Sequence, residues 1–124
     1  MREILFKAKR ISDGKWIEGS LIVYPDQTTG IVYDIGDIEG MRKEVVRPET
    51  VCQYTGLTDK DGKKIFEGDI LNENGEHFTV VYDSNWAKFK LQYLHAIQYP
   101  EWNRGVLMEV VGSIHDGEGG QHEQ

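Results

Sequence analysis

The stretch Asp69-Ile70-Leu71-Asn72-Glu73-Asn74-Gly75-Glu76-His77-Phe78-Thr79-Val80-Val81-Tyr82 decides the fold class of this chain of 124 residues. Every second residue from Phe78 to Tyr82 is large and apolar, which is the period of a strand that buries one face. Asn74 and Gly75 tolerate a positive φ, and this pair is typical of a two-residue hairpin turn. The stretch therefore predicts a β-hairpin in which Phe78, Val80 and Tyr82 point inward.

The same alternation continues directly after this hairpin. In residues 86–93, apolar side chains (Ala87, Phe89, Leu91, Tyr93) alternate with polar ones (Lys88, Lys90, Gln92). Two further turn signals, Ser12-Asp13-Gly14 and Asp59-Lys60-Asp61-Gly62, separate other strand-like segments. We therefore expect antiparallel neighbours along most of the chain.

The sequence as a whole predicts an all-β protein whose short antiparallel strands form a small barrel or sandwich. No window of 11 or more residues has a convincing helical period, and 14 glycines would interrupt any long helix. Roughly nine short strands with a turn every 8–12 residues favour this class. We expect a β meander in residues 1–55, an SH3-like barrel in residues 56–115 packed against it, and a flexible tail in residues 116–124.

The SH3-like expectation for the C-terminal half rests on the tetrapeptide Glu67-Gly68-Asp69-Ile70. A glycine, an aspartate and an aliphatic residue often open a strand after a hairpin in such barrels. Gly68 would permit the tight turn, Asp69 would accept hydrogen bonds from nearby backbone amides, and Ile70 would enter the core. The motif is a structural signal, because barrels of this kind bind many unrelated partners.

Composition and charge narrow the possible environments of the protein. The chain carries 14 basic and 21 acidic side chains, and residues 65–124 hold three of the basic and ten of the acidic ones. Cys52 is the single cysteine, so no internal disulfide can form. There is no apolar run near the roughly 20 residues of a membrane helix, and the N-terminal residues do not resemble a signal peptide. We expect a cytoplasmic protein with no membrane partner.

The motifs of nucleophilic and phosphate-binding enzymes are absent from the sequence. Cys52 lies in an apolar, strand-like stretch, where we expect a buried and inert thiol. An enzyme would need groups such as His95, Asp69 or Glu109 to meet in one cleft. We therefore expect no catalytic residues and no cofactor.

Metal binding is equally poorly supported by the spacing of possible ligands. The acidic turn of residues 59–62 fails as a calcium loop, because Leu57 and Gly68 would occupy ligand positions. The four histidines have no companion at the spacing of a metal site; they are His77, His95, His115 and His122. We expect no metal, and we interpret residues 59–62 as a hairpin turn.

Aromatic side chains that are expected to be exposed mark a possible interaction surface. Trp86 falls on the polar side of its predicted strand, and Tyr99 and Trp102 fall in a predicted loop, close to Lys88 and Lys90. Such residues could stack on single-stranded nucleic acid or form a subunit interface. Phosphate binding depends on cationic charge, and this half of the chain is acidic. We therefore favour a protein interface over nucleic acid.

Several stretches together resemble the YopX family of phages and prophages of Gram-positive bacteria. The longest match runs from Val51 to Ile70 and has the pattern Q-Y-T-G-L-x-D-x-x-G-x-x-I-x-x-G-D; shorter matches cover residues 6–10, 13–21 and 109–115. Ala8 and Cys52 stand where the family pattern tends to have glycine. The resemblance implies a phage or prophage origin and a bacterial host cytoplasm, and it is in keeping with a homo-oligomer. It carries over no catalytic residue.

The leading hypothesis is a non-enzymatic phage accessory protein that acts through contacts with itself and with a host or phage protein. The first alternative is an acidic decoy that mimics nucleic acid. It requires several carboxylates on one surface, namely those of Glu67, Asp69, Glu73, Glu76 and Asp83. The second alternative is weak binding of single-stranded nucleic acid.

Overall fold

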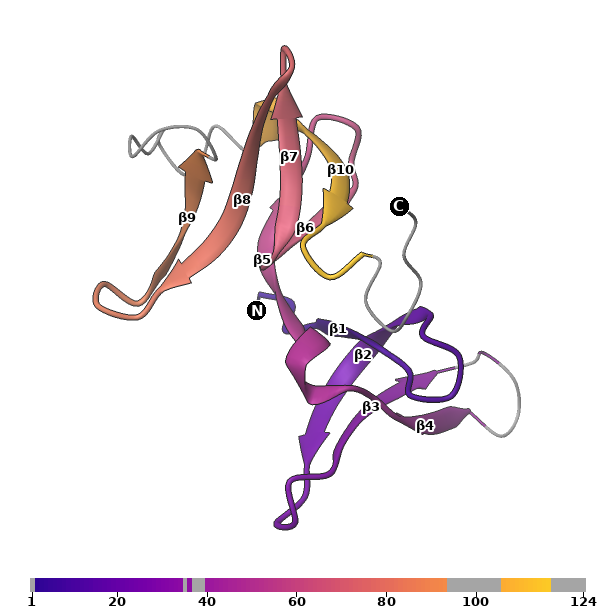
Figure 1. Cartoon of the computed structure of the whole chain (residues 1–124). Coiled ribbons are helices and arrows are strands. Elements are labelled where there is room, and N and C mark those ends of the chain that lie inside the picture. The colour runs from indigo at the N-terminus through magenta and orange to yellow at the C-terminus, as the bar shows by residue number, and fades with distance from the viewer. Residues whose placement is uncertain (1, 35, 37–39, 94–105, 117–124) are drawn as a thin grey trace. The chain divides into compact units, whose positions relative to one another are not determined.

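The structure is a computed structural model that describes residues 2–34, 36, 40–93 and 106–116. The protein is all-β, as the sequence predicted, and its strands pair antiparallel (Figure 1). The described residues include ten strands and the short 3₁₀ turn η1: β1 (Phe6–Lys9), β2 (Trp16–Val23), β3 (Thr29–Asp34), β4 (Met41–Val45), η1 (Pro48–Thr50), β5 (Cys52–Thr58), β6 (Lys64–Phe66), β7 (Asp69–Glu73), β8 (Glu76–Asp83), β9 (Lys88–Tyr93) and β10 (Glu109–Ser113).

The chain divides into two compact units, with a boundary between Gln53 and Tyr54. Of the described residues, those up to Gln53 form unit 1 and those from Tyr54 to Asp116 form unit 2. The expected packing of the two halves against each other and the SH3-like character of residues 56–115 stay predictions. Of the expected flexible tail, all but Asp116 lies outside the described residues.

Unit 1 is built around the long strand β2, which changes its partner halfway along. Residues 16–19 pair with β1, and residues 20–23 pair with β3. The change occurs at Gly19, where an added Cβ would lie 2.1 Å from the carbonyl oxygen of Val32. Only a residue without a side chain allows this close approach of two backbones, which is how glycine permits sharp bends in small barrels.

One sheet has the order β4-β3-β2-β1-β5-β6, and its strands β1 to β4 belong to unit 1. The chain after β4 also meets the chain after β1, which closes this part of the sheet. An isolated bridge joins Arg10, just after β1, to Val46, just after β4. The backbone N–H of Ile11 donates to the carbonyl of Val45 at 3.1 Å, and that of Arg47 donates to the carbonyl of Lys9 at 2.9 Å. The closed arrangement encloses a small core of Ala8, Ile31 and Val46, against which Phe6, Ile17, Leu21, Tyr33 and Val51 pack.

Unit 2 contains the four-stranded sheet β10-β7-β8-β9, with β5 and β6 paired beside it. The turn between β7 and β8 is the predicted two-residue turn, because Asn74 and Gly75 have φ values of 53° and 88°. The buried cluster of this unit combines β6, all four strands of the sheet and the residue before β10; it consists of Ile65, Leu71, Phe78, Val80, Leu91, Met108 and Val110.

Three orientations that the sequence suggested are wrong. Ile70 is only half-buried, and the core residue is Leu71, because the register sets Leu71 opposite Phe78 on the inner face. Tyr82 has the inward parity but is 46% exposed. Ala87 is exposed and has a φ of 52°, so it belongs to the turn before β9 rather than to the strand.

Two buried carboxylates hold the turns of unit 2, and sequence reasoning anticipated only one of them. Asp69 is 1% exposed and accepts a hydrogen bond from the backbone N–H of Phe66 at 2.8 Å, as expected for the turn motif. Asp59 is 4% exposed. It accepts hydrogen bonds from Asp61 and Lys63 in its own turn, and from the N–H of Val110, 51 positions away in the sequence, at 2.9 Å.

Candidate interaction surface

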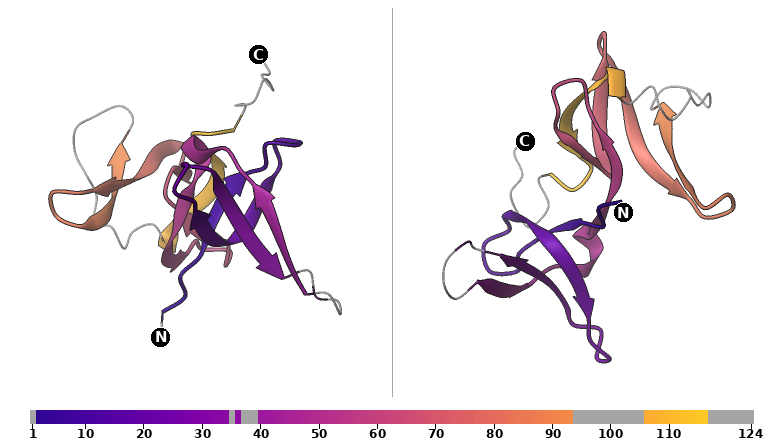
Figure 2. Two further views of the ribbon diagram at one scale, coloured as in Figure 1. Left: turned by 90° about the horizontal axis from the view of Figure 1, so that it is seen from below. Right: turned by 180° about the vertical axis from the view of Figure 1, so that it is seen from behind.

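The most prominent exposed feature of unit 2 is the outer part of the β8–β9 hairpin. Strand β7 pairs only with residues 76–79 of β8, whereas β8 continues to Asp83 and pairs there with Lys88 of β9. Residues 80–91, which we call the aromatic hairpin, form a two-stranded ribbon whose outer part extends beyond the end of β7 (Figure 2), whereas Val80 and Leu91 at its base lie in the core. Trp86 lies in the turn at its tip.

Asp83 fixes the turn of the aromatic hairpin. Its carboxylate accepts hydrogen bonds from the N–H of Asn85 at 3.0 Å and from the ammonium of Lys90 at 3.2 Å. Its carbonyl accepts one from the N–H of Trp86 at 3.2 Å. The bond from Lys90, together with the bond from Asn85, lowers the pKa of Asp83 below its usual value despite some desolvation. The turn thus holds the backbone of Trp86 in place.

The aromatic side chains of the hairpin remain accessible. Trp86 is 74% exposed and Tyr82 is 46% exposed. The ring of Tyr82 packs edge-on against that of Phe89, with centroids 5.3 Å apart. Since facing residues of a strand pair share one face, Tyr82 and Phe89 lie on the opposite face of the ribbon from Lys88 and Lys90.

The structure brings together three of the five residues predicted for the surface. Trp86, Lys88 and Lys90 lie in one hairpin, although Trp86 is in its turn and Lys90 is engaged by Asp83. Tyr99 and Trp102 lie outside the described residues. Sequence reasoning missed Tyr82 as a surface residue because its parity is that of the core. Tyr82 is exposed because β7 ends before it, and no local sequence pattern shows where β7 ends.

The acidic residues that a nucleic-acid mimic would use do not lie on one surface. Asp69 is buried, and Asp83 is bound to Lys90. Glu73 and Glu76 flank the turn at the other end of β8, roughly 23 Å away at the usual rise of an extended strand. These four described residues therefore do not form a continuous acidic face of the kind that the decoy hypothesis requires.

Of the residues considered for chemistry, Asp69 and Cys52 have structural roles. Asp69 is committed to its turn, Glu109 is half-buried in β10, and His95 lies outside the described residues. Cys52 is 1% exposed and donates a hydrogen bond to the carbonyl of Thr50. Within the part of the chain that the structure describes, no three His, Cys, Asp or Glu residues form a metal-binding group. The described residues also include no helix of the length and hydropathy needed to cross a membrane.

The fold and this surface define a small all-β protein of two units that presents an aromatic hairpin. The chain matches the YopX protein family over residues 5–118, and it belongs to that family. It is also similar to the crystal structure of protein EF1440 from Enterococcus faecalis, with 19% sequence identity and a TM-score of 0.58. That similarity covers 98% of this chain and 100% of the other, and it concerns the fold alone. No match was found among curated proteins.

Proposed function

We propose that the protein is a non-enzymatic accessory protein that acts through protein–protein contacts and assembles as a homo-oligomer through the aromatic hairpin. The observation that carries this proposal is the exposed side chain of Trp86 on a turn whose backbone is fixed by Asp83. An anchor held in place before binding loses little conformational freedom when it is buried. Tryptophan is among the residues that most often dominate interface energies.

The charge of unit 2 favours a protein partner over nucleic acid. Residues 54–116, which form unit 2, carry six basic and ten acidic side chains, so the net charge around the hairpin is negative and disfavours phosphate. The ammonium of Lys90 forms an ion pair with the carboxylate of Asp83. Lys88 is the other basic residue of the hairpin, and it has no ion pair among the described residues. A protein interface gains from buried aromatic area and does not require cationic charge.

The proposal also includes a setting for this function. The resemblance to the YopX family implies a phage or prophage origin, and we extend that origin and the host cytoplasm to this chain as part of the proposal. In such a setting the hairpin would contact a second copy of the chain, and the resulting assembly would engage a host or phage protein.

Sedimentation equilibrium of the full chain tests the proposal. The wild-type protein should self-associate, and Trp86→Ser should weaken association about thirtyfold, the effect of losing a hot spot of about 2 kcal/mol. Because each copy is acidic, raising the salt concentration should strengthen association by screening the repulsion between copies.

Val23→Ser is the matched control, since Val23 is an exposed apolar residue of unit 1 with 57% of its surface accessible. This variant should associate as the wild type does. A wild-type protein that stays monomeric at millimolar concentration, or a Trp86→Ser variant that associates equally well, would refute the proposal.

A further inference from the structure

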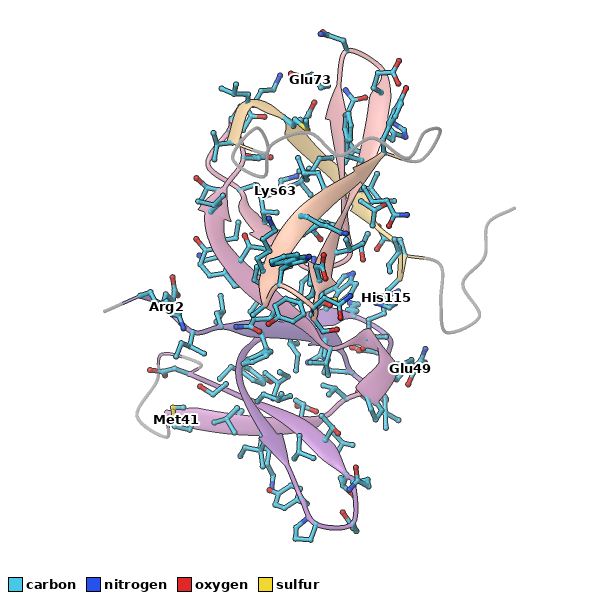
Figure 3. All side chains as sticks on the ribbon, turned by 90° about the vertical axis from the view of Figure 1, so that its left-hand side faces the viewer. Arg2, Met41, Glu49, Lys63, Glu73 and His115 are labelled. Carbon is cyan, nitrogen blue, oxygen red and sulfur yellow. The ribbon has the colours of Figure 1, made fainter. Side chains whose placement is uncertain are left out.

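The turn between β7 and β8 joins two residues whose side chain and backbone can react with each other. Asn74 is followed directly by Gly75, and both residues are exposed. Glu73, labelled in Figure 3, ends β7 before this turn, and Glu76 begins β8 after it. Neither the side-chain amide of Asn74 nor the N–H of Gly75 has a hydrogen-bond partner among the described residues.

An asparagine can modify itself when the backbone nitrogen of the next residue attacks its side chain. Here the nitrogen of Gly75 would give its proton to water or hydroxide and form a bond to Cγ of Asn74. The side-chain nitrogen takes up a proton and leaves as ammonia, and the product is a five-membered succinimide ring. Water then opens the ring at one of its two carbonyls, which yields aspartate or isoaspartate. Glycine hinders the attack least, because it has no side chain.

The other asparagines that the structure describes are better protected from this reaction. Asn72 lies within β7, which has a paired strand on each side. The N–H of Asn85 donates to the carboxylate of Asp83 at 3.0 Å, and the next backbone nitrogen, that of Trp86, donates to the carbonyl of Asp83 at 3.2 Å. Each of the two is followed by a residue with a bulky side chain. Reaction is therefore expected first at Asn74.

The folded turn keeps the two reacting groups apart. Asn74 and Gly75 have φ values of 53° and 88°, which are those of a type I′ turn. The first residue of such a turn has a ψ of about 30°. At this angle the nitrogen of Gly75 points away from the Cβ of Asn74, whereas ring closure requires both on the same side of the Cα–C bond. The turn must therefore open before the reaction, and the frequency of this local opening sets the rate.

The pair of residues that closes the turn favours such an opening. Glu73 and Glu76 face each other in the register of β7 and β8. Carboxylates in facing positions weaken a strand pair, because like charges repel. Further along the same hairpin, Leu71 faces Phe78, and both are buried. The opening is therefore expected at the outer end of the hairpin.

We propose that Asn74 is a site of spontaneous covalent modification, converting to aspartate and isoaspartate at a rate controlled by opening of the β7–β8 hairpin. Aspartate is compatible with the turn, because Asp-Gly also favours type I′. Isoaspartate carries the main chain through its former side chain, so it adds a methylene group to a two-residue turn and disrupts the pairing of Glu73 with Glu76. The modification therefore weakens unit 2 as the protein ages. It does not depend on the aromatic hairpin or on the proposed function.

Peptide mass mapping of the full chain, kept folded for several weeks at mildly alkaline pH, tests the proposal. The peptide with Asn74 should gain the mass that accompanies replacement of NH₂ by OH, and a protein isoaspartyl methyltransferase should methylate it. Conversion at Asn72 and Asn85 should be slower by about tenfold or more. In urea, where the turn is lost, Asn74 should convert about tenfold faster than in the folded chain.

Two variants with the same charge change test whether the end of the hairpin controls the rate. Glu76→Lys replaces a repulsion with an attraction across the closing pair, so conversion at Asn74 should slow about threefold. Glu49→Lys makes this change at an exposed position of unit 1 and should leave the rate unchanged. If Glu76→Lys fails to fold, the comparison of the folded chain with the chain in urea still decides.

The ¹H–¹⁵N spectrum of the aged protein measures the consequence for the fold. Second signals for the amides of Leu71 and Phe78 should grow in proportion to the isoaspartate content, whereas the signal of Ile31 in unit 1 should stay single. Asn74→Asp supplies the aspartate product alone, and its spectrum should match that of the wild type outside the turn.

Three results would overturn the proposal. The first is that Asn74 stays unmodified in the folded chain, and the second is that Asn72 or Asn85 converts as fast. The third is that Asn74 converts equally fast in the folded chain and in urea, or in the two lysine variants, because opening of the hairpin would then not control the reaction.

Discussion

The two units close their strands by different means. Unit 1 returns to its own beginning through backbone hydrogen bonds, in which Ile11 meets Val45 and Arg47 meets Lys9. Unit 2 closes its turns and one edge with carboxylates, namely those of Asp59, Asp69 and Asp116. The integrity of unit 1 therefore depends on how closely backbones can approach, whereas that of unit 2 depends on carboxylates that accept backbone hydrogen bonds.

Because of this difference, the two units should respond differently to mutation and to pH. A backbone closure is insensitive to acid but intolerant of added volume at the crossing point. A closure by carboxylates tolerates changes in the backbone but weakens when the buried carboxylate of Asp59 is protonated or replaced. The following predictions test this contrast, beginning with the largest effect.

Gly19→Ala should have the largest effect, a loss of about 3 kcal/mol in the free energy of unfolding of unit 1. The added methyl group would lie 2.1 Å from the carbonyl oxygen of Val32, and both backbones would have to move apart. Urea denaturation can follow unit 1 through the fluorescence of Trp16 after Trp86 and Trp102 are replaced by phenylalanine.

Gly14→Ala is the matched control for this substitution. Gly14 has a φ of 73°, and nothing lies within 4 Å of its added Cβ. The alanine therefore introduces backbone strain in a turn but no steric clash. The expected loss is about 1 kcal/mol. Equal losses for the two alanine variants would show that the strand crossing at Gly19 is not the tight point of unit 1.

Asp59→Asn should destabilise unit 2 by about 2 kcal/mol. An amide in place of the carboxylate keeps one acceptor oxygen but presents an NH₂ group to one of the three backbone N–H donors. Hydrogen exchange at the amides of Leu71 and Leu91 measures the effect, and Asp61→Asn in the exposed part of the same turn is the control. If Asp59→Asn is as stable as the wild type, Asp59 does not stabilise the closure of unit 2.

Acidification should destabilise unit 2 more than unit 1. Burial raises the pKa of Asp59, but hydrogen bonds from Val110, Lys63 and Asp61 outweigh it, so the pKa lies below its usual value. The resulting stabilisation is complete above the pKa of the unfolded chain, about 3.9. It is lost as the pH falls from there through the lower pKa of the folded state. Between pH 5 and pH 2.5, the amide of Leu91 in unit 2 should lose more of its protection from hydrogen exchange than the amide of Ile31 in unit 1. Asp59→Asn should reduce this difference between the units.

Trp86→Ser should have the smallest effect on folding, within about 0.5 kcal/mol, because its side chain is 74% exposed. Thermal unfolding of dilute protein measures this directly. A substantial loss of stability would mean that Trp86 packs within unit 2 and is not available to a partner.

The sequence predicted the features that depend on neighbouring residues. The hairpin at Asn74 and Gly75 and the inward direction of Phe78 and Val80 follow from turn chemistry and alternation. The role of Asp69 in its turn followed from a local motif. These features involve residues a few positions apart, so the pattern of one segment is enough to reveal them.

The features that the sequence did not reveal depend on where distant strands meet. The hydrogen bond that the N–H of Val110 donates to Asp59 spans 51 positions, and the crowding at Gly19 arises from the carbonyl of Val32. Tyr82 is exposed because β7 ends before it. For the candidate surface, sequence patterns found Trp86, Lys88 and Lys90 but could not show that Asp83 holds the turn and engages Lys90.

Amide hydrogen exchange at low and high protein concentration tests the role of the aromatic hairpin most directly. If Trp86 anchors contacts between copies, amides in residues 82–88 should become protected as the concentration rises, and Trp86→Ser should abolish that protection. Exchange that is independent of concentration, or protection that appears only in unit 1, would contradict the assignment of this hairpin as the contact surface.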